Sequence, residues 1–398
     1  MGLSEADGIF LAKLTFARLI DLFLGDMPMD TFTQLVGERI RLAREGAGLS
    51  QEKLTEALGF NDRQTLSTIE LGQRRVSAEE LVRFAKALGQ TVDYFTDPYR
   101  VAGADAFSYR AKRTTAAALR AFELKAGNLI AAQRRFQELL SRPPSPAQPQ
   151  IAVLTPHASL DFATLQGERC AAAWQLGEAP ALRLREAAAQ NLGVVVLHVD
   201  APRTISGAAC RLADGAYVLI NRAEPAARRT FDLGHELFHI LTWDKMPPPR
   251  VDQIPEEGPT GGKRPKVERL ADAFTAGLLM PTATVQSRWA QRGDQGLAEW
   301  LSANARELGV SHLALYWRLA NLGLIKSDAD TLHRVDRLRS ASVETRPAPY
   351  SADFVRDLHT LIADGLVTVR RVLTLLDLDE DELKGIFTSY QMEPPFDL

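Results

Sequence analysis

The chain has 398 residues, more than one hydrophobic core usually organises, which predicts two or three domains. Hydrophobic residues make up 45% and charged residues 24%, an ordinary globular mixture that excludes wholesale disorder. The formal net charge of −3 gives no general attraction to nucleic acid or to an anionic membrane, so any such binding depends on a local surface.

The two cysteines and the hydropathy pattern favour a cytoplasmic protein. Cys170 and Cys210 stand in unrelated contexts, without the paired spacing of a disulfide framework or a thiolate metal site. No uninterrupted apolar run of about 18 residues occurs, so we expect no membrane span.

Residues 1–29 form an extension ahead of the first recognisable domain. Charged residues interrupt its apolar stretch from Gly8 to Leu24, which is unlike a signal peptide. The extension is either an amphipathic helix or translation from a start codon upstream of the real one, because Met27 and Met29 directly precede the domain. Whether these residues belong to the native protein stays open.

Residues 30–100 show short helical segments separated by tight turns, as in a compact five-helix domain. Ser50 is placed to cap a helix over 51–58, and Ser77 with Glu80 forms a capping box for a later one. Gly59 ends that first helix, and a further helix is predicted over 62–71. The pattern predicts two helices joined by a short turn at Gly59.

This segment resembles the Cro/repressor-type (XRE) helix-turn-helix family through GERIRLAREGAGLSQEKLTEALGF and TLSTIELGQRRVSAEELVRFAKALG, with one extra residue between Gly59 and Glu70. The resemblance implies that the third helix enters the major groove of double-stranded DNA. Side chains able to read base edges are Asn61, Arg63, Gln64, Thr65 and Ser67. Phosphate contacts are expected from Gln51, Gln73, Arg74 and Arg75. The alternative is a dimerisation or peptide-docking module.

Residues 101–140 are interpreted as a helical connector with a solvated basic face made by Arg110, Lys112, Arg113, Arg120, Lys125, Arg134 and Arg135. A Pro-rich linker at 141–155 follows, with four prolines between Ser141 and Gln150. We place the main domain boundary there.

Residues 156–285 predict an α+β domain with a small antiparallel sheet. An apolar, β-branched run from Gly193 to Asp200 has the length of a strand. Two further runs, Ile205 to Leu212 and Ala216 to Asn221, flank a turn signal and predict a hairpin. The edge of this hairpin near Tyr217 to Asn221 is a candidate to hold an extended substrate by strand addition.

The helix predicted over 226–241 carries the sequence His-Glu-Leu-Phe-His. Its four-residue spacing places His235 and His239 on one face, where both imidazoles can bind one cation. Glu236 lies about 100° around the helix, where it can accept a proton from a metal-bound water. The alternative is a pair of buried core histidines, each of which would need other hydrogen-bond partners.

A catalytic zinc site needs a third protein ligand, for which the acidic candidates downstream are Asp244, Glu256, Glu257, Glu268 and Asp272. The segments VLINRAEPAARRTFDLGHELFHIL and ERLADAFTAGLLMP resemble the ImmA/IrrE family of metallopeptidases. The resemblance implies that Glu268 is the third ligand, in a zincin-like fold. Asp272 replaces the usual Asn of the family and is either a rival ligand or a partner that orients an imidazole. The expected metal is Zn²⁺, with Mn²⁺ as the alternative.

The loop from Trp243 to Lys266 is interpreted either as a lid or border of the substrate cleft or as a surface insertion. Residues 286–398 predict further helices, and LSANARELGVSHLALYWRLANLGLI resembles the helical extension that follows this peptidase domain. We interpret the extension as a packed buttress, with Leu313, Leu315, Trp317 and Leu319 directed to the core. Contact with substrate or DNA is the alternative.

The two resemblances imply a multidomain, mainly helical protein that is both a zinc-dependent endopeptidase and a DNA-binding regulator. Its substrate would be a repressor or antitoxin-like regulatory protein, cut in a stress or mobile-element response. The alternative is a non-proteolytic transcriptional regulator or antitoxin whose metal-containing domain senses a ligand or partner. The intact Glu236 favours catalysis. No membrane partner is expected, and a homodimer is an alternative to the monomer.

Overall fold

The computed structural model describes residues 29–97, 107–111, 115–142, 153–212, 215–248, 251–253, 265–336 and 346–396. The chain divides into two compact units, one of residues 1–106 with 127–135 and the other of residues 107–126 with 136–398. The interpretations of the N-terminal extension, of most of the Pro-rich linker and of much of the loop after Trp243 fall outside the described residues. The expected mainly helical, multidomain class is confirmed.

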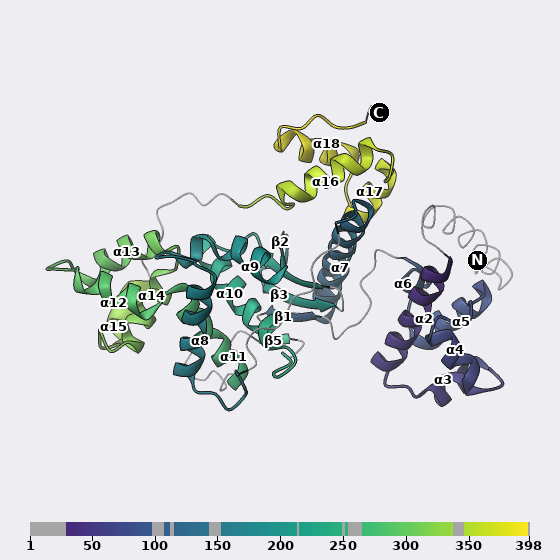
Figure 1. The fold of residues 1–398 in the computed structure, drawn as a ribbon, viewed down its shortest axis with the longest axis horizontal. Helices are drawn as coiled ribbons and strands as arrows, with labels where there is room; N and C mark the ends of the chain where they lie inside the picture. The colour runs from purple at the N-terminus through teal and green to yellow at the C-terminus, as the bar shows by residue number, and fades with distance from the viewer. Residues whose placement is uncertain are drawn as a thin grey trace. The chain divides into compact units, whose positions relative to one another are not determined.

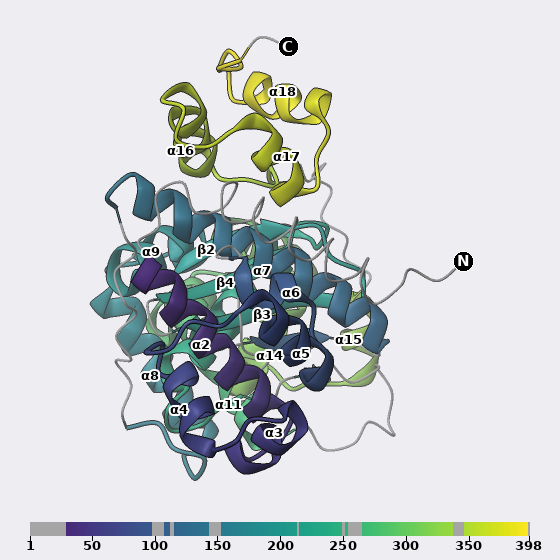
Figure 2. The ribbon, with the colours of Figure 1, turned by 90° about the vertical axis from the view of Figure 1, so that its right-hand side faces the viewer.

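The first unit contains the expected five helices, which are α2 (Met29–Gly46), α3 (Gln51–Leu58), α4 (Arg63–Glu70), α5 (Ala78–Leu88) and α6 (Val92–Thr96). Ser50 caps α3 by accepting from the Lys53 amide, and Ser77 with Glu80 forms the capping box of α5. Gly59 ends α3 at a φ of 68°, in the left-handed region that favours glycine. The turn between α3 and α4 is visible in Figure 2.

The second unit is built around a sheet whose order is β2-β4-β3-β1-β5. The strands are β1 (Phe107–Ala111), β2 (Val195–Val199), β3 (Ile205–Leu212), β4 (Gly215–Asn221) and β5 (Val251–Gln253). The predicted hairpin is confirmed, because β3 and β4 pair antiparallel. The prediction of a purely antiparallel sheet is wrong, since β2 pairs parallel with β4 and β5 pairs parallel with β1.

The parallel pairing of β2 also corrects the predicted substrate edge. β2 covers the side of β4 that β3 leaves open, so Tyr217 to Asn221 lie in an interior strand. Their backbone hydrogen-bonding groups are used within the sheet, which leaves none for strand addition at that position.

The helical interpretation of residues 107–111 is wrong, because these residues form β1 and pair antiparallel with β3. The sequence Phe-Ser-Tyr-Arg alternates apolar and polar residues, and a strand sends alternate side chains to opposite faces. Phe107 and Tyr109 stack with ring centroids 5.5 Å apart, and Tyr109 meets Phe122 of α7 (Ala116–Leu139) edge-on. Arg110 is buried, whereas the sequence had suggested a solvated basic face.

Helices cover the sheet and extend beyond it (Figure 1). The helices after α7 are α8 (Leu160–Ala173), α9 (Leu184–Leu192), α10 (Ala226–Thr242), α11 (Lys266–Leu279), α12 (Thr282–Ala290), α13 (Leu297–Leu308), α14 (His312–Asn321), α15 (Ala329–Asp336), α16 (Ala352–Ala363), α17 (Val369–Leu376) and α18 (Glu380–Ser389). Helix α10 contacts β3 and β4, and α11 packs against both α10 and α8. Among the described helices, none has the length and apolar character needed to cross a membrane.

The helices from α12 to α15 extend the core of the second unit. Leu315 and Leu319 of α14 are fully buried, as expected of a packed buttress, and Leu313 is half-buried. Trp317 was predicted to point into the core but is 42% exposed, so that prediction is wrong. On α14, residue 317 lies two positions from both 315 and 319, which places it about 160–200° around the helix from the buried face.

Helices α8 and α11 cross at two glycines. A Cβ atom at Gly167 would lie 2.0 Å from the Phe274 carbonyl oxygen, and one at Gly277 would lie 2.1 Å from the Thr164 carbonyl oxygen. Because these neighbours are backbone atoms, the glycines allow the two helices to approach closely. The crossing fixes the position of α11, which carries Glu268 and Asp272.

We expect Gly277→Ala to lower the free energy of unfolding by about 1–3 kcal/mol or more, because the Thr164 backbone cannot rotate out of the way. Gly385→Ala is the matched control, since Gly385 lies within α18 with no atom within 4 Å of an added Cβ. The control should be neutral or stabilise by up to ~1 kcal/mol. Thermal unfolding followed by circular dichroism measures both, and equal melting temperatures would contradict the close crossing.

Candidate metal centre and nucleic-acid interface

Helix α10 presents His235, Glu236 and His239 toward the interior of the second unit. The helix starts directly after Pro225, and its residues from Asp232 to Thr242 are all buried between the sheet and α11. His235 and His239 lie on one face with ring centroids 4.9 Å apart. A helix that carries polar groups into a core in this way must give them partners there.

Glu268 of α11 lies opposite the two histidines. Its Oε2 atom is 3.1 Å from His235 Nε2 and 3.4 Å from His239 Nε2, and the two Nε2 atoms are 3.2 Å apart. One ligand atom from each of these three residues falls within 4.8 Å of the others. All three side chains are buried. Two imidazole nitrogens and one carboxylate oxygen at this separation can hold a divalent cation.

The charge states of two of the three residues, Glu268 and His239, suit metal binding. Burial acts to raise the pKa of the Glu268 carboxyl, but the hydrogen bonds from His235 and His239 outweigh it and hold the pKa well below its usual range. Burial lowers the pKa of His239. At neutral pH these two groups are therefore a carboxylate and a neutral imidazole, the forms that bind metals. Burial acts to lower the pKa of His235, but its hydrogen bonds with Asp272 and Glu268 outweigh burial and raise that pKa.

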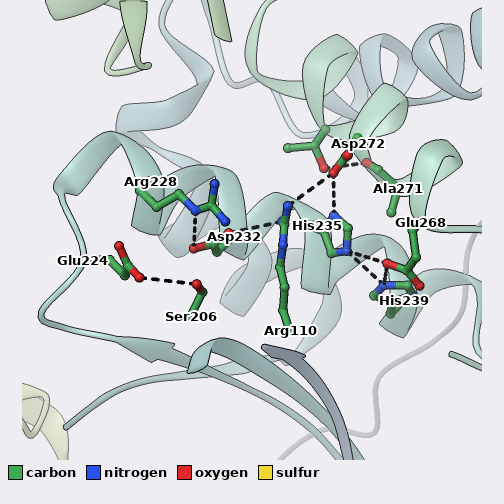
Figure 3. Close-up of polar contacts among 11 residues, drawn as sticks. Arg110, Ser206, Glu224, Arg228, Asp232, His235, His239, Glu268, Ala271 and Asp272 are labelled. Atoms are coloured by element: carbon green, nitrogen blue, oxygen red, sulfur yellow. Dashed lines mark hydrogen bonds and ion pairs between the residues drawn. The ribbon is translucent and has the colours of Figure 1, made fainter. Parts of the chain in front are cut away.

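Asp272 lies one turn after Glu268 on α11 and contacts the other ring nitrogen of His235. Its Oδ1 atom is 3.0 Å from His235 Nδ1 (Figure 3). A ring nitrogen that donates to a carboxylate leaves the opposite nitrogen free to bind a metal, so this geometry supports the role of orienting an imidazole. Asp272 lies on the Nδ1 side of the ring, whereas Glu268 lies on the Nε2 side.

Glu236 takes no part in the hydrogen bonds of these residues. Its side chain is 1% exposed, and both of its carboxylate oxygens lack a hydrogen-bond partner among the described residues. Burial raises the pKa of Glu236 to about 8. A buried carboxyl without a partner is unfavourable unless it serves a ligand or a reaction, which marks Glu236 as a functional candidate.

The remaining acidic candidates do not join the cluster. Asp244 pairs with Arg211 of β3 at 2.6 Å, and its side chain is 62% exposed. Glu256 and Glu257 lie outside the described residues.

The sequence analysis did not connect Arg110 or Asp232 with the cluster. Arg110 of β1 and Asp232 of α10 form a buried ion pair of 3.1 Å. The alternation in Phe-Ser-Tyr-Arg was the available signal for Arg110, because it indicates a strand with one polar face. For Asp232, the signal was its position three residues before His235, almost one helical turn away.

A groove with a volume of about 770 Å³ opens beside the cluster, between α8, α10, α11 and α14. Its lining includes Asp272, the exposed apolar side chains of Leu165 and Trp317, and the basic side chains of Arg228 and Arg269. The groove thus offers a mixed apolar and charged surface that reaches a residue in contact with His235.

In the first unit, four of the predicted DNA contacts are exposed near α4, namely Asn61, Gln64, Gln73 and Arg75, and Arg63 is 63% exposed at its side chain. Thr65 and Ser67 are half-buried. These seven residues remain predicted DNA contacts.

Gln51 and Arg74 are engaged within the domain. Gln51 Nε2 donates to Glu70 at 2.7 Å and its Oε1 accepts from Arg63 at 2.9 Å, while Arg74 donates to Glu80 at 2.7 Å. Either side chain would have to give up these hydrogen bonds in order to contact a phosphate.

A buried ion pair holds α4 in place. Arg44 of α2 donates to both carboxylate oxygens of Glu70, at 2.6 and 3.0 Å. The two-bond geometry between a guanidinium and a carboxylate is directional, so it sets the orientation of α4 relative to α2. Gln51 brings α3 into the same network.

Comparison with known proteins finds a different family in each of the two units. Residues 40–95 match the helix-turn-helix family model, and residues 189–320 match the model of the IrrE N-terminal-like domain, a peptidase family. The chain therefore carries an XRE-type helix-turn-helix domain and an ImmA/IrrE-type peptidase domain, as the two sequence resemblances indicated.

Curated relatives match only a 60-residue segment, 15% of the chain. The segment is 43% identical to an uncharacterized HTH-type transcriptional regulator of Sinorhizobium medicae and to one of Rhizobium meliloti. It is 40% identical to an uncharacterized transcriptional regulator in the ATPase CF(0) region of Rhodospirillum rubrum. The match spans 42% of the first two relatives and 55% of the third.

We expect Asp272→Ala to weaken Co²⁺ or Zn²⁺ binding by about 10–100-fold, because His235 loses the acceptor that orients its ring. Asp272→Asn keeps an oxygen acceptor and should lose less affinity. Competition with a chromogenic chelator measures both. Equal affinities of Asp272→Ala and the unmodified chain would show that the imidazole needs no such partner.

Proposed function

We propose that this chain is a zinc-dependent endopeptidase coupled to a DNA-binding domain, and that it cleaves a repressor or antitoxin-like regulatory protein. The supporting observation is the convergence of His235, His239 and Glu268, whose ligand atoms lie within 4.8 Å of one another, with a buried, unpartnered Glu236 on the same helix. The proposal assigns the three converging residues as metal ligands and Glu236 as the general base.

The donor set fits a catalytic zinc ion better than a structural one. Structural zinc sites usually have four Cys or His ligands, whereas this cluster offers two imidazoles and one carboxylate among the described residues. Three protein ligands leave a coordination position open for water or substrate. Mn²⁺ also binds to imidazole and carboxylate ligands, so the identity of the metal as zinc is itself a proposal.

A divalent cation at this position would polarise a peptide carbonyl and lower the pKa of a water molecule. Glu236 accepts the proton from that water and delivers it to the leaving amine. The lack of hydrogen-bond partners for its carboxylate oxygens within the described residues supports this role, because no protein group there competes with water for them. Asp272 keeps the His235 ring oriented through both steps.

In this proposal the groove beside Asp272 is the place for the substrate polypeptide, and its lining reaches Asp272 but does not include His235, Glu236, His239 or Glu268. Asp272 lines the groove and contacts His235, and the rest of the lining combines apolar side chains with arginines. Since β4 is an interior strand, this groove replaces strand addition at Tyr217 to Asn221 in the proposal.

The first unit supports a DNA-binding role for the same chain. The Arg44–Glu70 ion pair fixes α4, and exposed amide and guanidinium groups on and after α4 can contact bases and phosphates. A protease held at an operator would meet regulatory proteins bound there.

The deep burial of the cluster favours a second candidate function, a non-proteolytic regulator or antitoxin that senses a metal or partner. His235, Glu236, His239 and Glu268 are each at most 1% exposed. Such a site can hold a metal without admitting a polypeptide.

The two candidates are separated by comparing His235→Ala and Glu236→Gln with the unmodified chain. We expect Glu236→Gln to bind one metal ion but to lose cleavage of co-encoded repressor-like proteins by at least about 100-fold, since only the proton acceptor is removed. His235→Ala should lose both. Metal content is measured by mass spectrometry and cleavage by gel electrophoresis.

Chelation provides the control, since removing the metal should abolish cleavage and adding zinc should restore it. Metal bound without any cleavage would favour the sensing function. A chain that binds no metal would overturn the peptidase proposal.

On DNA, we expect Gln64→Ala to reduce affinity for the preferred operator by about 1–3 kcal/mol and to relax the choice of base at one position. Arg75→Ala should weaken binding to all sequences and reduce the slope of log affinity against log salt by about 1. Lys86→Ala is the matched charge control on α5 and should leave the slope unchanged. Fluorescence anisotropy over a salt series measures all three.

A further inference from the structure

Arg110 connects the strand β1 to both helices that carry the candidate metal ligands. Its Nη1 atom lies 3.1 Å from Asp232 Oδ1 on α10, and its Nη2 atom lies 3.5 Å from Asp272 Oδ1 on α11. The guanidinium carbon is 5.7 Å from the centre of the Phe231 ring. Figure 3 shows Arg110 extending from the sheet to the two helices.

The two aspartates are placed close to the ligands on their own helices. Asp232 precedes His235 by three residues, and Asp272 follows Glu268 by four, so each lies about one helical turn from a ligand. The Oδ1 atom of Asp272 that meets Arg110 is also the atom 3.0 Å from His235 Nδ1. Arg110 therefore contacts the group that orients a candidate ligand.

Both groups of the Arg110–Asp232 ion pair are buried. Arg110 is 4% exposed at its side chain and Asp232 is 0% exposed, so neither group can turn to bulk water instead. Asp232 has a second partner in Arg228, at 3.2 Å, but Arg228 is 37% exposed and lies on α10 itself. Arg110, by contrast, lies on β1 and contacts an aspartate on each of the two helices.

We propose that Arg110 is a positioning residue of the metal centre, which fixes the separation of α10 and α11 and the orientation of Asp272. The inference rests on the proposed function, because it takes His235, His239 and Glu268 as the ligands. It adds a residue outside the matched peptidase segment, which starts at residue 189. The metal centre then depends on the stretch between the helix-turn-helix match, which ends at residue 95, and the peptidase match.

The test is a Co²⁺ titration of the full-length chain followed by visible absorption, which reports both affinity and ligand geometry. We expect Arg110→Met to weaken Co²⁺ binding by about 10–100-fold and to change the absorption spectrum, as for other partners of metal ligands. Arg110→Lys should recover part of the loss, because lysine restores the charge but not the two-armed geometry. Arg211→Met is the matched control, since Arg211 lies on β3 and pairs with Asp244, whose side chain is 62% exposed.

A double substitution separates positioning from general damage to the fold. If Arg110 acts through Asp272, the loss caused by Arg110→Met should shrink to less than about threefold in the Asp272→Ala background, because coupled residues are not additive. Losses that multiply fully would overturn the inference. So would an Arg110→Met chain that unfolds at a lower temperature yet keeps the Co²⁺ affinity and spectrum of the unmodified chain.

Three further outcomes are distinguishable. If Arg110→Met does not fold, Arg110→Lys carries the test, and a Co²⁺ affinity equal to that of the unmodified chain overturns the inference. If the unmodified chain binds no Co²⁺, the proposed function and this inference both fail. If it binds Co²⁺ but cuts no protein, the peptidase proposal fails while the Arg110 comparison still decides the inference.

Discussion

The hydrogen bonds between the imidazoles of α10 and the carboxylate of Glu268 on α11 are the contact on which the second unit depends. The relevant atoms lie 3.1 and 3.4 Å apart in a part of the core closed to solvent. Burying polar groups this deeply without partners is unfavourable, so these contacts constrain the separation of the two helices. The glycines at 167 and 277 meet part of this constraint by letting α8 support α11 at backbone contact.

The sheet also helps to hold the two helices at this separation. Helix α10 lies on β3 and β4, and β1 adds Arg110 from a segment far from α10 in the sequence. A buried guanidinium between carboxylates on two helices compensates their charge and links the two helices. The matched peptidase segment starts at residue 189, so this contribution comes from outside it.

In the first unit, one buried ion pair likewise fixes the position of one helix relative to another. Arg44 and Glu70 join α2 to the end of α4, and Gln51 adds α3 to the same network. Fixing the helices in this way leaves the polar side chains at the start of α4 exposed. The proposed function combines this surface with the metal centre, so that one chain both locates a regulatory protein and cleaves it.

The sequence by itself determined the local features of this protein. Capping residues and left-handed glycines marked the helices of the first unit, the turn signal marked the β3–β4 hairpin, and the spacing of His235 and His239 placed both on one helical face. These features depend on neighbours within a few residues, so a pattern along the chain is enough to show them.

Only the tertiary structure decided which distant segments meet. It placed β2 beside β4, which turned the expected substrate edge into an interior strand, and it made residues 107–111 a strand whose Arg110 is buried against Asp232. It also left Trp317 at the wall of a groove. Strand pairing and the burial of charge are settled by contacts between segments far apart in sequence, and local propensity carries little information about them.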